Sequence, residues 1–197
     1  HETLVMTGGS MFYIDAVCNG LDNLPGGDPA LRSELWQRLG EEGVEVLAEE
    51  LRRKDPLTYS QIDTRNSQRV IRALEVCLVS GKPFSSFKTG ERRKRSFEIE
   101  KVGLTRPREE LYSRIDQRAL NMMDEGLVEE VRSLLPCRDC QALQTVGYKE
   151  IFEYLDGKIP LEEAVRLIQR NTRHYAKKQL TWWRRDPAIR WVEVSGQ

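Results

Sequence analysis

Histidine is almost missing from this chain of 197 residues, which contains only His1 and His174. A Ser-His or Cys-His pair needs an imidazole beside the nucleophile, and two isolated histidines give neither arrangement support. We therefore exclude both kinds of nucleophilic site. A general base must then be a carboxylate, or must lie outside this chain.

Cysteine is also sparse, and only Cys137 and Cys140, of four cysteines, have the spacing of metal ligands. A structural zinc site needs four ligands, and no second pair is present. We expect ordinary reduced thiols and no metal-ligating residues. The Gly-Lys pairs at 81–82 and 157–158 lack the upstream glycine and the following hydroxyl residue of a Walker A loop.

Long apolar runs are absent as well, and no stretch approaches the roughly eighteen residues of a membrane span. No signal peptide is visible at the start, so we expect a cytoplasmic protein without a membrane partner. Hydrophobic residues make up 39% of the chain and charged residues 31%. That composition allows a buried core and argues against global disorder.

The formal net charge of the whole chain is zero, but separate blocks of the sequence are strongly charged. Residues 1–64 carry a net charge of −7, residues 65–118 carry +7, residues 119–163 carry −6, and residues 164–192 carry +7. A basic block can form a local anion-binding surface while the acidic blocks balance the whole chain. Zero net charge therefore does not exclude a polyanion as partner, although charge blocks can also be solvated helix faces.

Two cationic stripes have helical spacing. The first stripe consists of Arg65, Arg69 and Arg72, and the second consists of Arg166, Arg170, Arg173 and Lys177. No acidic residue lies between Glu163 and Asp186, so we expect the second stripe to have no local ion-pair partners. An unpaired cationic stripe repels itself, which favours anion binding over a merely solvated face.

Hydrophobic periodicity predicts many helices and few strands. We expect helices at 11–17, 29–39, 41–54, 66–79, 107–123, 127–135, 148–155 and 160–185, a short one from Asp55-Pro56, and strands at 4–7, 97–104 and 189–194. Asp28 is expected to cap the second helix and Gly81 to end the helix at 66–79. That helix should bury Val70, Leu74, Cys77 and Leu78.

Two segments suggest ligand contacts. Gly8-Gly9-Ser10 joins an expected strand to a helix, where backbone N–H groups can hold an anion, although a tight turn explains the glycines equally well. Residues 177–185 interleave cations with Trp182 and Trp183. Cations suit phosphates and a flat ring suits an unstacked base, so this segment favours nucleic-acid contact. One of the two rings is expected to be a core aromatic.

Five ordered motifs resemble one family. They are Gly8–Tyr13, Asp28–Arg32, Asn66–Val76, Val146–Glu150 and Tyr175–Trp182, and together they are similar to the bacterial tRNA dimethylallyltransferase (isopentenyltransferase) family. The resemblance covers essentially the whole chain. Ser10 stands where the family usually has threonine, which keeps the hydroxyl.

The resemblance implies an α/β fold, an incomplete P-loop NTPase-like core with few strands and many helices, and an inserted all-helical tRNA-binding domain. Residues 1–20 and 97–197 would form the core and residues 21–96 the insertion, which grips the anticodon stem. The family's P-loop and early catalytic Asp would precede this chain. We therefore expect a fragment, inactive by itself.

The implied reaction transfers a dimethylallyl group from dimethylallyl diphosphate to N6 of the adenosine on the 3′ side of the anticodon. By similarity, Ser10 would orient N6. Arg118, or its rival Arg114 one turn earlier, would contact the diphosphate; the alternative for either is an ion pair within the helix. Mg²⁺ would be the cofactor, with its main ligands outside this chain.

The tRNA anticodon stem-loop is the expected macromolecular partner of a monomer. The positions that match family tRNA contacts are Arg32, Gln68, Arg69, Arg72, Gln144, Gly147, Tyr148, Lys149, Lys177, Lys178, Gln179, Thr181, Trp182 and Arg184, to which the second stripe adds Arg173. Two alternatives stay open: an adenylate isopentenyltransferase-like enzyme that acts on free nucleotides, and a non-catalytic RNA-binding helical module.

Overall fold

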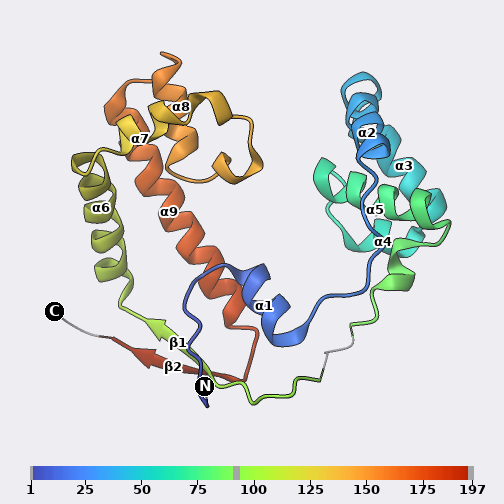
Figure 1. The fold of residues 1–197 in the computed structure, drawn as a ribbon, viewed down its shortest axis with the longest axis horizontal. Helices are drawn as coiled ribbons and strands as arrows, with labels where there is room; N and C mark the ends of the chain where they lie inside the picture. Colours follow the sequence, from blue (N-terminus) through green and yellow to red (C-terminus); the bar gives the residue numbers. More distant parts are fainter. Residues whose placement is uncertain (1, 91–93, 195–197) are drawn as a thin grey trace. The chain divides into compact units, whose positions relative to one another are not determined.

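The computed structural model describes residues 2–90 and 94–194, which are mostly helical with a small parallel sheet (Figure 1). The helices are α1 (Met11–Asn19), α2 (Pro29–Glu42), α3 (Val44–Lys54), α4 (Pro56–Gln61), α5 (Ser67–Ser80), α6 (Arg108–Asp124), α7 (Leu127–Ser133), α8 (Tyr148–Leu155) and α9 (Leu161–Trp183). The strands are β1 (Lys101–Thr105) and β2 (Ile189–Glu193), and the short 3-10 helices are η1 (Phe84–Phe87), η2 (Leu135–Cys137) and η3 (Gln141–Leu143).

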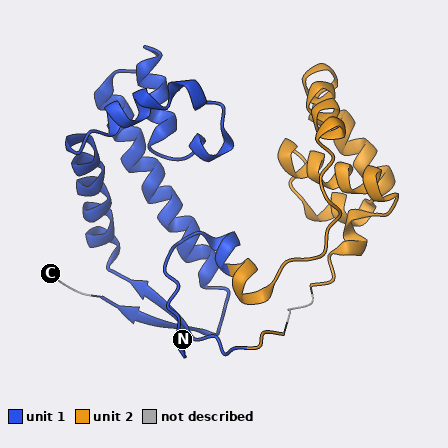
Figure 2. Ribbon diagram, in the orientation of Figure 1, with its two compact units in different colours: residues 1–14, 97–197 blue, residues 15–96 orange. Residues whose placement is uncertain are grey.

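The chain folds as two compact units, each with its own core (Figure 2). One unit combines residues 1–14 with 97–197, and the other consists of residues 15–96. We call them the α9 unit and the α5 unit after their central helices. Residues 15–20, which we expected in the first unit, are grouped with the α5 unit.

The α5 unit packs α2, α3 and α4 around α5. Leu35, Leu47, Leu51, Val70 and Leu74 are completely buried where these helices meet. The apolar residues of α3 and α5 recur at helical spacing, so each helix buries one stripe against the others. The expected boundaries at Asp28, Asn66 and Gly81 are all observed.

Asp55 joins the start of α4 to η1 in the α5 unit through hydrogen bonds that an apolar side chain could not accept. The side chain is 1% exposed. Its carboxylate accepts hydrogen bonds from the backbone N–H and hydroxyl of Thr58 at 3.0 and 2.6 Å, and from the backbone N–H and hydroxyl of Ser85 at 2.7 and 2.9 Å. These bonds cap α4 and fix η1 beside it. Burial opposes the charged form, but the four donors outweigh it and lower the pKa of Asp55.

The α9 unit is built around the longest described helix. Helices α6 and α8 pack on α9, and α7 packs on α8. Its core contains Val131, Ile151, Ala164 and Ile168. Strands β1 and β2 are parallel, with Lys101 opposite Ile189 and Gly103 opposite Trp191. Gly103 lacks a side chain where the ring of Trp191 lies against the strand.

Several expectations about the elements were wrong. Residues 4–7 are not a strand, because β1 and β2 are the only pair that exchanges ladder hydrogen bonds among the described residues, and Leu4 and Val5 are more than four fifths exposed. Strand β1 begins at Lys101 instead of Phe97, and α2 extends three residues beyond Leu39. Leu78 is 36% exposed, while Ile71, Ala73 and Val76 are buried. Helix α5 buries more than one stripe because α2, α3 and η1 all pack against it.

Removing the carboxylate of Asp55 should destabilise the α5 unit. Asp55→Ala leaves the Ser85 and Thr58 donors without acceptors, so we expect a loss of about 2–4 kcal/mol in the free energy of unfolding. Because the folded-state pKa of Asp55 is lowered, its stabilising effect is present above the unfolded-state pKa and is lost as the pH falls through the folded value. Urea unfolding at pH 7 and at lower pH measures both effects. Asp63→Ala, which removes an exposed acid, should shift the midpoint little, and an equal shift for both variants would contradict this role.

Candidate nucleic-acid interface

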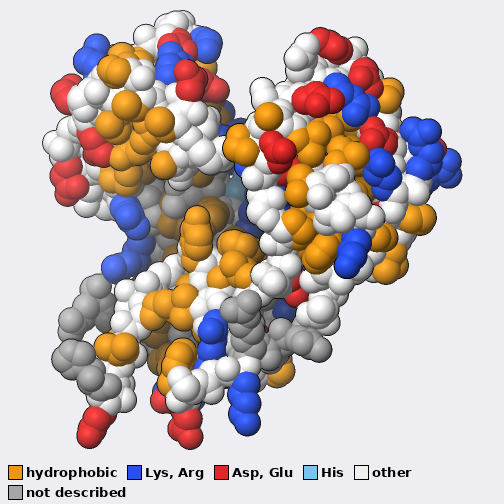
Figure 3. All heavy atoms as spheres, turned by 45° about the vertical axis from the view of Figure 1, so that its right-hand side comes forward, with side chains coloured by type: hydrophobic (Ala, Val, Ile, Leu, Met, Phe, Trp, Pro, Cys, Tyr) orange, Lys and Arg blue, Asp and Glu red, His pale blue; other side chains and the backbone are white. Residues whose placement is uncertain are grey.

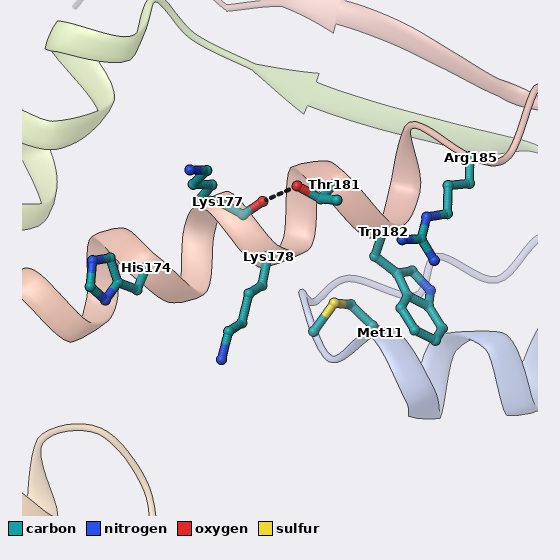
Figure 4. A pocket seen from close by; sticks show the side chains of 7 residues that line it. All are labelled: Met11, His174, Lys177, Lys178, Thr181, Trp182 and Arg185. Atoms are coloured by element: carbon teal, nitrogen blue, oxygen red, sulfur yellow. Dashed lines mark hydrogen bonds between the residues drawn. The ribbon is translucent and has the colours of Figure 1, made fainter. Parts of the chain in front are cut away.

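The C-terminal half of α9 forms one wall of an open pocket. Its first half is buried through Ala164 and Ile168, whereas the later turns are largely exposed. The pocket has a volume of about 450 Å³ and is lined by Met11, His174, Lys177, Lys178, Thr181, Trp182 and Arg185. Figure 4 shows the Trp182 ring beside the Met11 side chain, with Lys177 and Lys178 pointing to different sides of α9.

The pocket combines the groups that an aromatic, anionic ligand needs. Trp182 is 40% exposed and offers a ring face. Trp183 is half-buried but belongs to neither core, so the expectation that one ring of the pair is a core aromatic was wrong. Lys178 and Arg185 bring positive charge to the same pocket. The arrangement can stack a base and attract a phosphate.

A side-chain amide fastens the Gly-Gly-Ser turn to α9. Gln179 Nε2 donates a hydrogen bond to the carbonyl of Gly9 at 2.8 Å, and a Cβ on Gly9 would overlap that amide. A side chain at this position would displace the Gln179 amide. Ser10 follows the turn with an exposed side chain, and its carbonyl accepts the Ile14 N–H as α1 begins. Met11, the next residue, lines the pocket, whereas Ser10 is not among the residues that line it.

The expectation that the second stripe has no local partners was wrong. Arg166 pairs with Glu163 one turn earlier, and Arg173 pairs with Asp116 of α6. Asp116 is distant in sequence, and only the packing of α6 on α9 brings it to Arg173. Lys177, Lys178 and Arg184 have no ion pair with any described residue, so the free positive charge gathers at the pocket end of α9.

The first stripe, like the second, contains both arginines with ion pairs and an arginine without one. Arg65 pairs with Asp63, and Arg72 pairs with Glu75, whereas Gln68 and Arg69 are exposed and Arg69 has no ion pair within the described ranges. Arg32 of α2 also pairs with Glu75. Among the expected tRNA contacts, the α5 unit thus carries two paired cations, Arg32 and Arg72, and one, Arg69, without an ion pair to a described residue.

The Val146–Glu150 motif is held against α9 by a buried acid. Gly147 has φ +102°, a conformation that favours glycine, and its N–H donates to Glu150 Oε2 at 2.8 Å. Glu150 Oε1 accepts a hydrogen bond from Asn171 of α9 at 2.6 Å. The Tyr148 hydroxyl donates to Glu130, and this bond raises the pKa of Tyr148.

The remaining expected site residues lie at the surface. Lys149 and Gln144 are exposed, and Gln144 Nε2 donates to the Arg138 carbonyl at 2.8 Å. Arg114 and Arg118 are exposed on α6. Two neighbouring acids on that helix pair with other arginines: Glu110 with Arg106, and Asp116 with Arg173.

The described residues do not assemble a metal site. They contain no group of three or more His, Cys, Asp or Glu side chains that could hold an ion. The four thiols are free, with Cys18 and Cys77 buried and Cys137 and Cys140 exposed. No helix within 2–90 or 94–194 is long and apolar enough to cross a membrane.

Sequence reasoning missed Met11 and His174 as pocket residues, and it included Arg185 only within the segment 177–185. A signal for His174 was available, because His174, Lys178 and Trp182 recur every four residues and therefore share one face of α9. No periodic pattern marks Met11, which follows a turn that Gln179 contacts.

The fold and the site together are those of a mostly helical protein with a cationic pocket beside an exposed tryptophan ring. A family model described as IPP transferase matches residues 1–186, and the chain belongs to that family.

Individual relatives agree with this assignment. The tRNA dimethylallyltransferase 2 of Porphyromonas gingivalis is 55% identical over 97% of this chain and 64% of its own length. The chain thus spans less than two thirds of that relative. A tRNA isopentenylpyrophosphate transferase structure from Bacillus halodurans is 36% identical, with a TM-score of 0.55 over 92% of this chain and 56% of the other. A eukaryotic dimethylallyltransferase shares the fold, with a TM-score of 0.69 at 23% identity, over 94% of this chain and 50% of the other.

Loss of the Gln179 amide should release the Gly-Gly-Ser turn. In Gln179→Ala, the Gly9 carbonyl keeps only the longer hydrogen bond from the Tyr175 hydroxyl, at 3.5 Å. The turn should loosen, so the Ile14 amide, which donates to the Ser10 carbonyl, should exchange with solvent faster, by roughly tenfold if one hydrogen bond is lost. Hydrogen exchange followed by mass spectrometry measures this. Arg170→Ala, an exposed change on the same helix, is the control. Unchanged exchange at Ile14 in Gln179→Ala would show that the amide does not fix the turn.

Proposed function

We propose that the protein containing this chain transfers a dimethylallyl group from dimethylallyl diphosphate to N6 of the adenosine on the 3′ side of a tRNA anticodon. Family membership supports the reaction class, and relatives are named as tRNA dimethylallyltransferases. The observation that carries the proposal is the pocket in which Trp182, Lys178 and Arg185 meet the start of α1.

The pocket suits a nucleotide that has left the base stack. A flipped adenine would stack on Trp182, while the cations at this end of α9 attract the adjoining phosphates. Paired cations such as Arg166 contribute less to a surrounding field, because Glu163 already offsets their charge. Binding should therefore depend on Lys177 and Lys178 more than on the start of the stripe.

The reaction joins N6 to the allylic carbon while the bond from that carbon to the diphosphate oxygen breaks. The electron pair leaves with diphosphate, and the N6 proton passes to a general base, a role that we assign to no described residue. Ser10, which directly precedes the pocket residue Met11, would orient N6 through its hydroxyl.

Diphosphate gains charge as it leaves and needs preorganised cations. Arg118 is the first candidate and Arg114 the second, and both are exposed on α6. Mg²⁺ would supply further charge neutralisation, but the described residues gather no carboxylate cluster to hold it. We therefore assign the ion no step.

The α5 unit is proposed to grip the anticodon stem. Its exposed Gln68 and Arg69, and the half-exposed guanidinium groups of Arg32 and Arg72, offer donors to phosphates. On the face drawn in Figure 3, blue cations stand among exposed hydrophobic side chains. A monomer in the cytoplasm is part of the same proposal.

Neutralising the free lysines should weaken RNA binding more than neutralising a paired arginine. For the double variant Lys177→Gln and Lys178→Gln, we expect about tenfold weaker binding of an anticodon stem-loop and a salt slope lower by roughly one per lost contact. Fluorescence anisotropy across a salt series gives both numbers. Arg166→Gln is the matched control, and an equal loss for that variant would refute the distinction between free and paired charge.

Substrate choice separates this function from its closest alternative. The complete gene product that carries this sequence should prenylate an anticodon stem-loop far faster than AMP, because a free nucleotide has no stem for the α5 unit to bind. Radiolabelled dimethylallyl diphosphate follows both reactions. Preference for AMP would favour an adenylate isopentenyltransferase, and binding of the stem-loop without any transfer would favour a non-catalytic RNA-binding module.

A further inference from the structure

Glu75 is a completely buried carboxylate that contacts two of the expected tRNA-binding arginines. Arg32 donates from Nε and Nη2 to its two oxygens at 3.1 and 2.9 Å, and Arg72 Nη1 donates at 2.8 Å. The backbone N–H of Asp28 supplies a fourth hydrogen bond at 3.1 Å. The side chain of Glu75 is 0% exposed, whereas those of Arg32 and Arg72 are 48% and 35% exposed.

The same cluster fixes the turn that precedes α2. Arg72 Nη2 donates to the Pro25 carbonyl at 3.1 Å. A Cβ on Gly27 would lie 2.5 Å from Arg32 Nη2 and 3.1 Å from Glu75 Oε1, so the pair packs directly on this glycine. The stretch from Pro25 to Arg32, at the start of α2, is therefore joined to Arg72 of α5 through Glu75 and Arg72 itself.

Packing alone does not explain an acid at this position. Leu35 and Leu74 already bury the contact of α2 with α5, and well-packed hydrophobic residues in place of a whole buried ion-pair cluster are often at least as stabilising. Burial disfavours the charged form of Glu75, but the two arginines outweigh this effect and lower its pKa. The carboxylate is thus kept ionised by the groups that it holds in place.

The two arginines keep binding capacity while they are held. Arg32 has one terminal nitrogen, Nη1, with no hydrogen bond to any described residue, and both guanidinium groups reach the surface. Two arginines and one glutamate leave a net charge of +1. A guanidinium with a fixed orientation loses less conformational freedom when it binds a phosphate than a mobile one.

We propose that Glu75 is a positioning residue for tRNA recognition, which holds Arg32 and Arg72 in the orientation that contacts phosphates of the anticodon stem. This role rests on the proposed function. It makes the RNA-contacting surface of the α5 unit depend on a residue that RNA does not touch.

Glu75→Gln distinguishes a positioning role of Glu75 from a purely electrostatic effect on RNA binding. Removal of an acid raises the net charge by one, so simple electrostatics predicts tighter RNA binding. Loss of the positioned arginines predicts weaker binding, and we expect the anticodon stem-loop to bind about tenfold more weakly. An unrelated RNA duplex of equal length should bind as tightly as before, or more tightly, because its binding depends only on the charge of the protein surface.

Glu49→Gln is the matched control. Glu49 is an exposed acid on α3 that pairs only with Arg52, so its loss adds the same charge without touching Arg32 or Arg72. Stem-loop binding by this variant should match or exceed that of the original chain. Weaker binding by Glu49→Gln would assign the loss to general charge disturbance and would overturn the proposal.

Arg32→Lys keeps the test valid if Glu75→Gln does not fold. Lysine retains the charge but cannot pair through two parallel N–H groups, so stem-loop affinity should fall while the thermal midpoint changes little. If the double variant Arg32→Lys, Glu75→Gln folds, its loss of stem-loop affinity should differ strongly from the sum of the losses in the two single variants. Stem-loop binding equal to the original in either single variant would overturn the role of Glu75. Absence of stem-loop binding by the original chain would instead contradict the proposed function.

Discussion

A carboxylate leaves water only where other donors replace the water that solvated it. Three buried acids among the described residues meet that requirement, and each joins segments that lie far apart in sequence. Asp55 fixes η1 to the start of α4, Glu75 joins α2 to α5, and Glu150 joins the turn before α8 to α9. Apolar side chains fill both cores, but they do not specify these junctions, because dispersion contacts have little directional preference. These buried acids fix the orientations of Arg32 and Arg72, the position of η1 and the turn before α8.

Charge pairing explains why a chain without net charge can present a cationic surface. Some of the positive charge on α9 and α5 is offset by acids one turn away, such as Glu163 beside Arg166, and some by acids that only the tertiary fold brings close, such as Asp116 opposite Arg173. On α9 and the residues just after it, most of the cations without an ion pair to a described residue lie near Trp182. Charge blocks in the sequence therefore pointed to α9, and the fold decided which of its cations have no ion pair.

Local signals predicted most of the helices, and the sequence resemblance predicted the family that the comparisons show. Asp28, Asn66 and Gly81 mark helix ends by bonds within a few residues, so the sequence contains all the information that those ends need. The strand expected at 4–7 failed because a strand requires a neighbour that no local pattern reveals. The partner of Arg173 and the contact of Gln179 with Gly9 were equally inaccessible, since both join residues separated by more than fifty positions. The roles of individual residues in binding tRNA and diphosphate stay predictions.

Photocrosslinking of the target nucleotide tests the central claim most directly. An anticodon stem-loop that carries a photoreactive purine at the modified position would be bound to the protein, irradiated, and digested for mass spectrometry. The pocket predicts crosslinks in the peptides that contain Met11 or residues 174–185, with loss of those crosslinks when unlabelled stem-loop competes. Crosslinks confined to residues 21–90, with none near α9, would contradict the assignment of the base to this pocket.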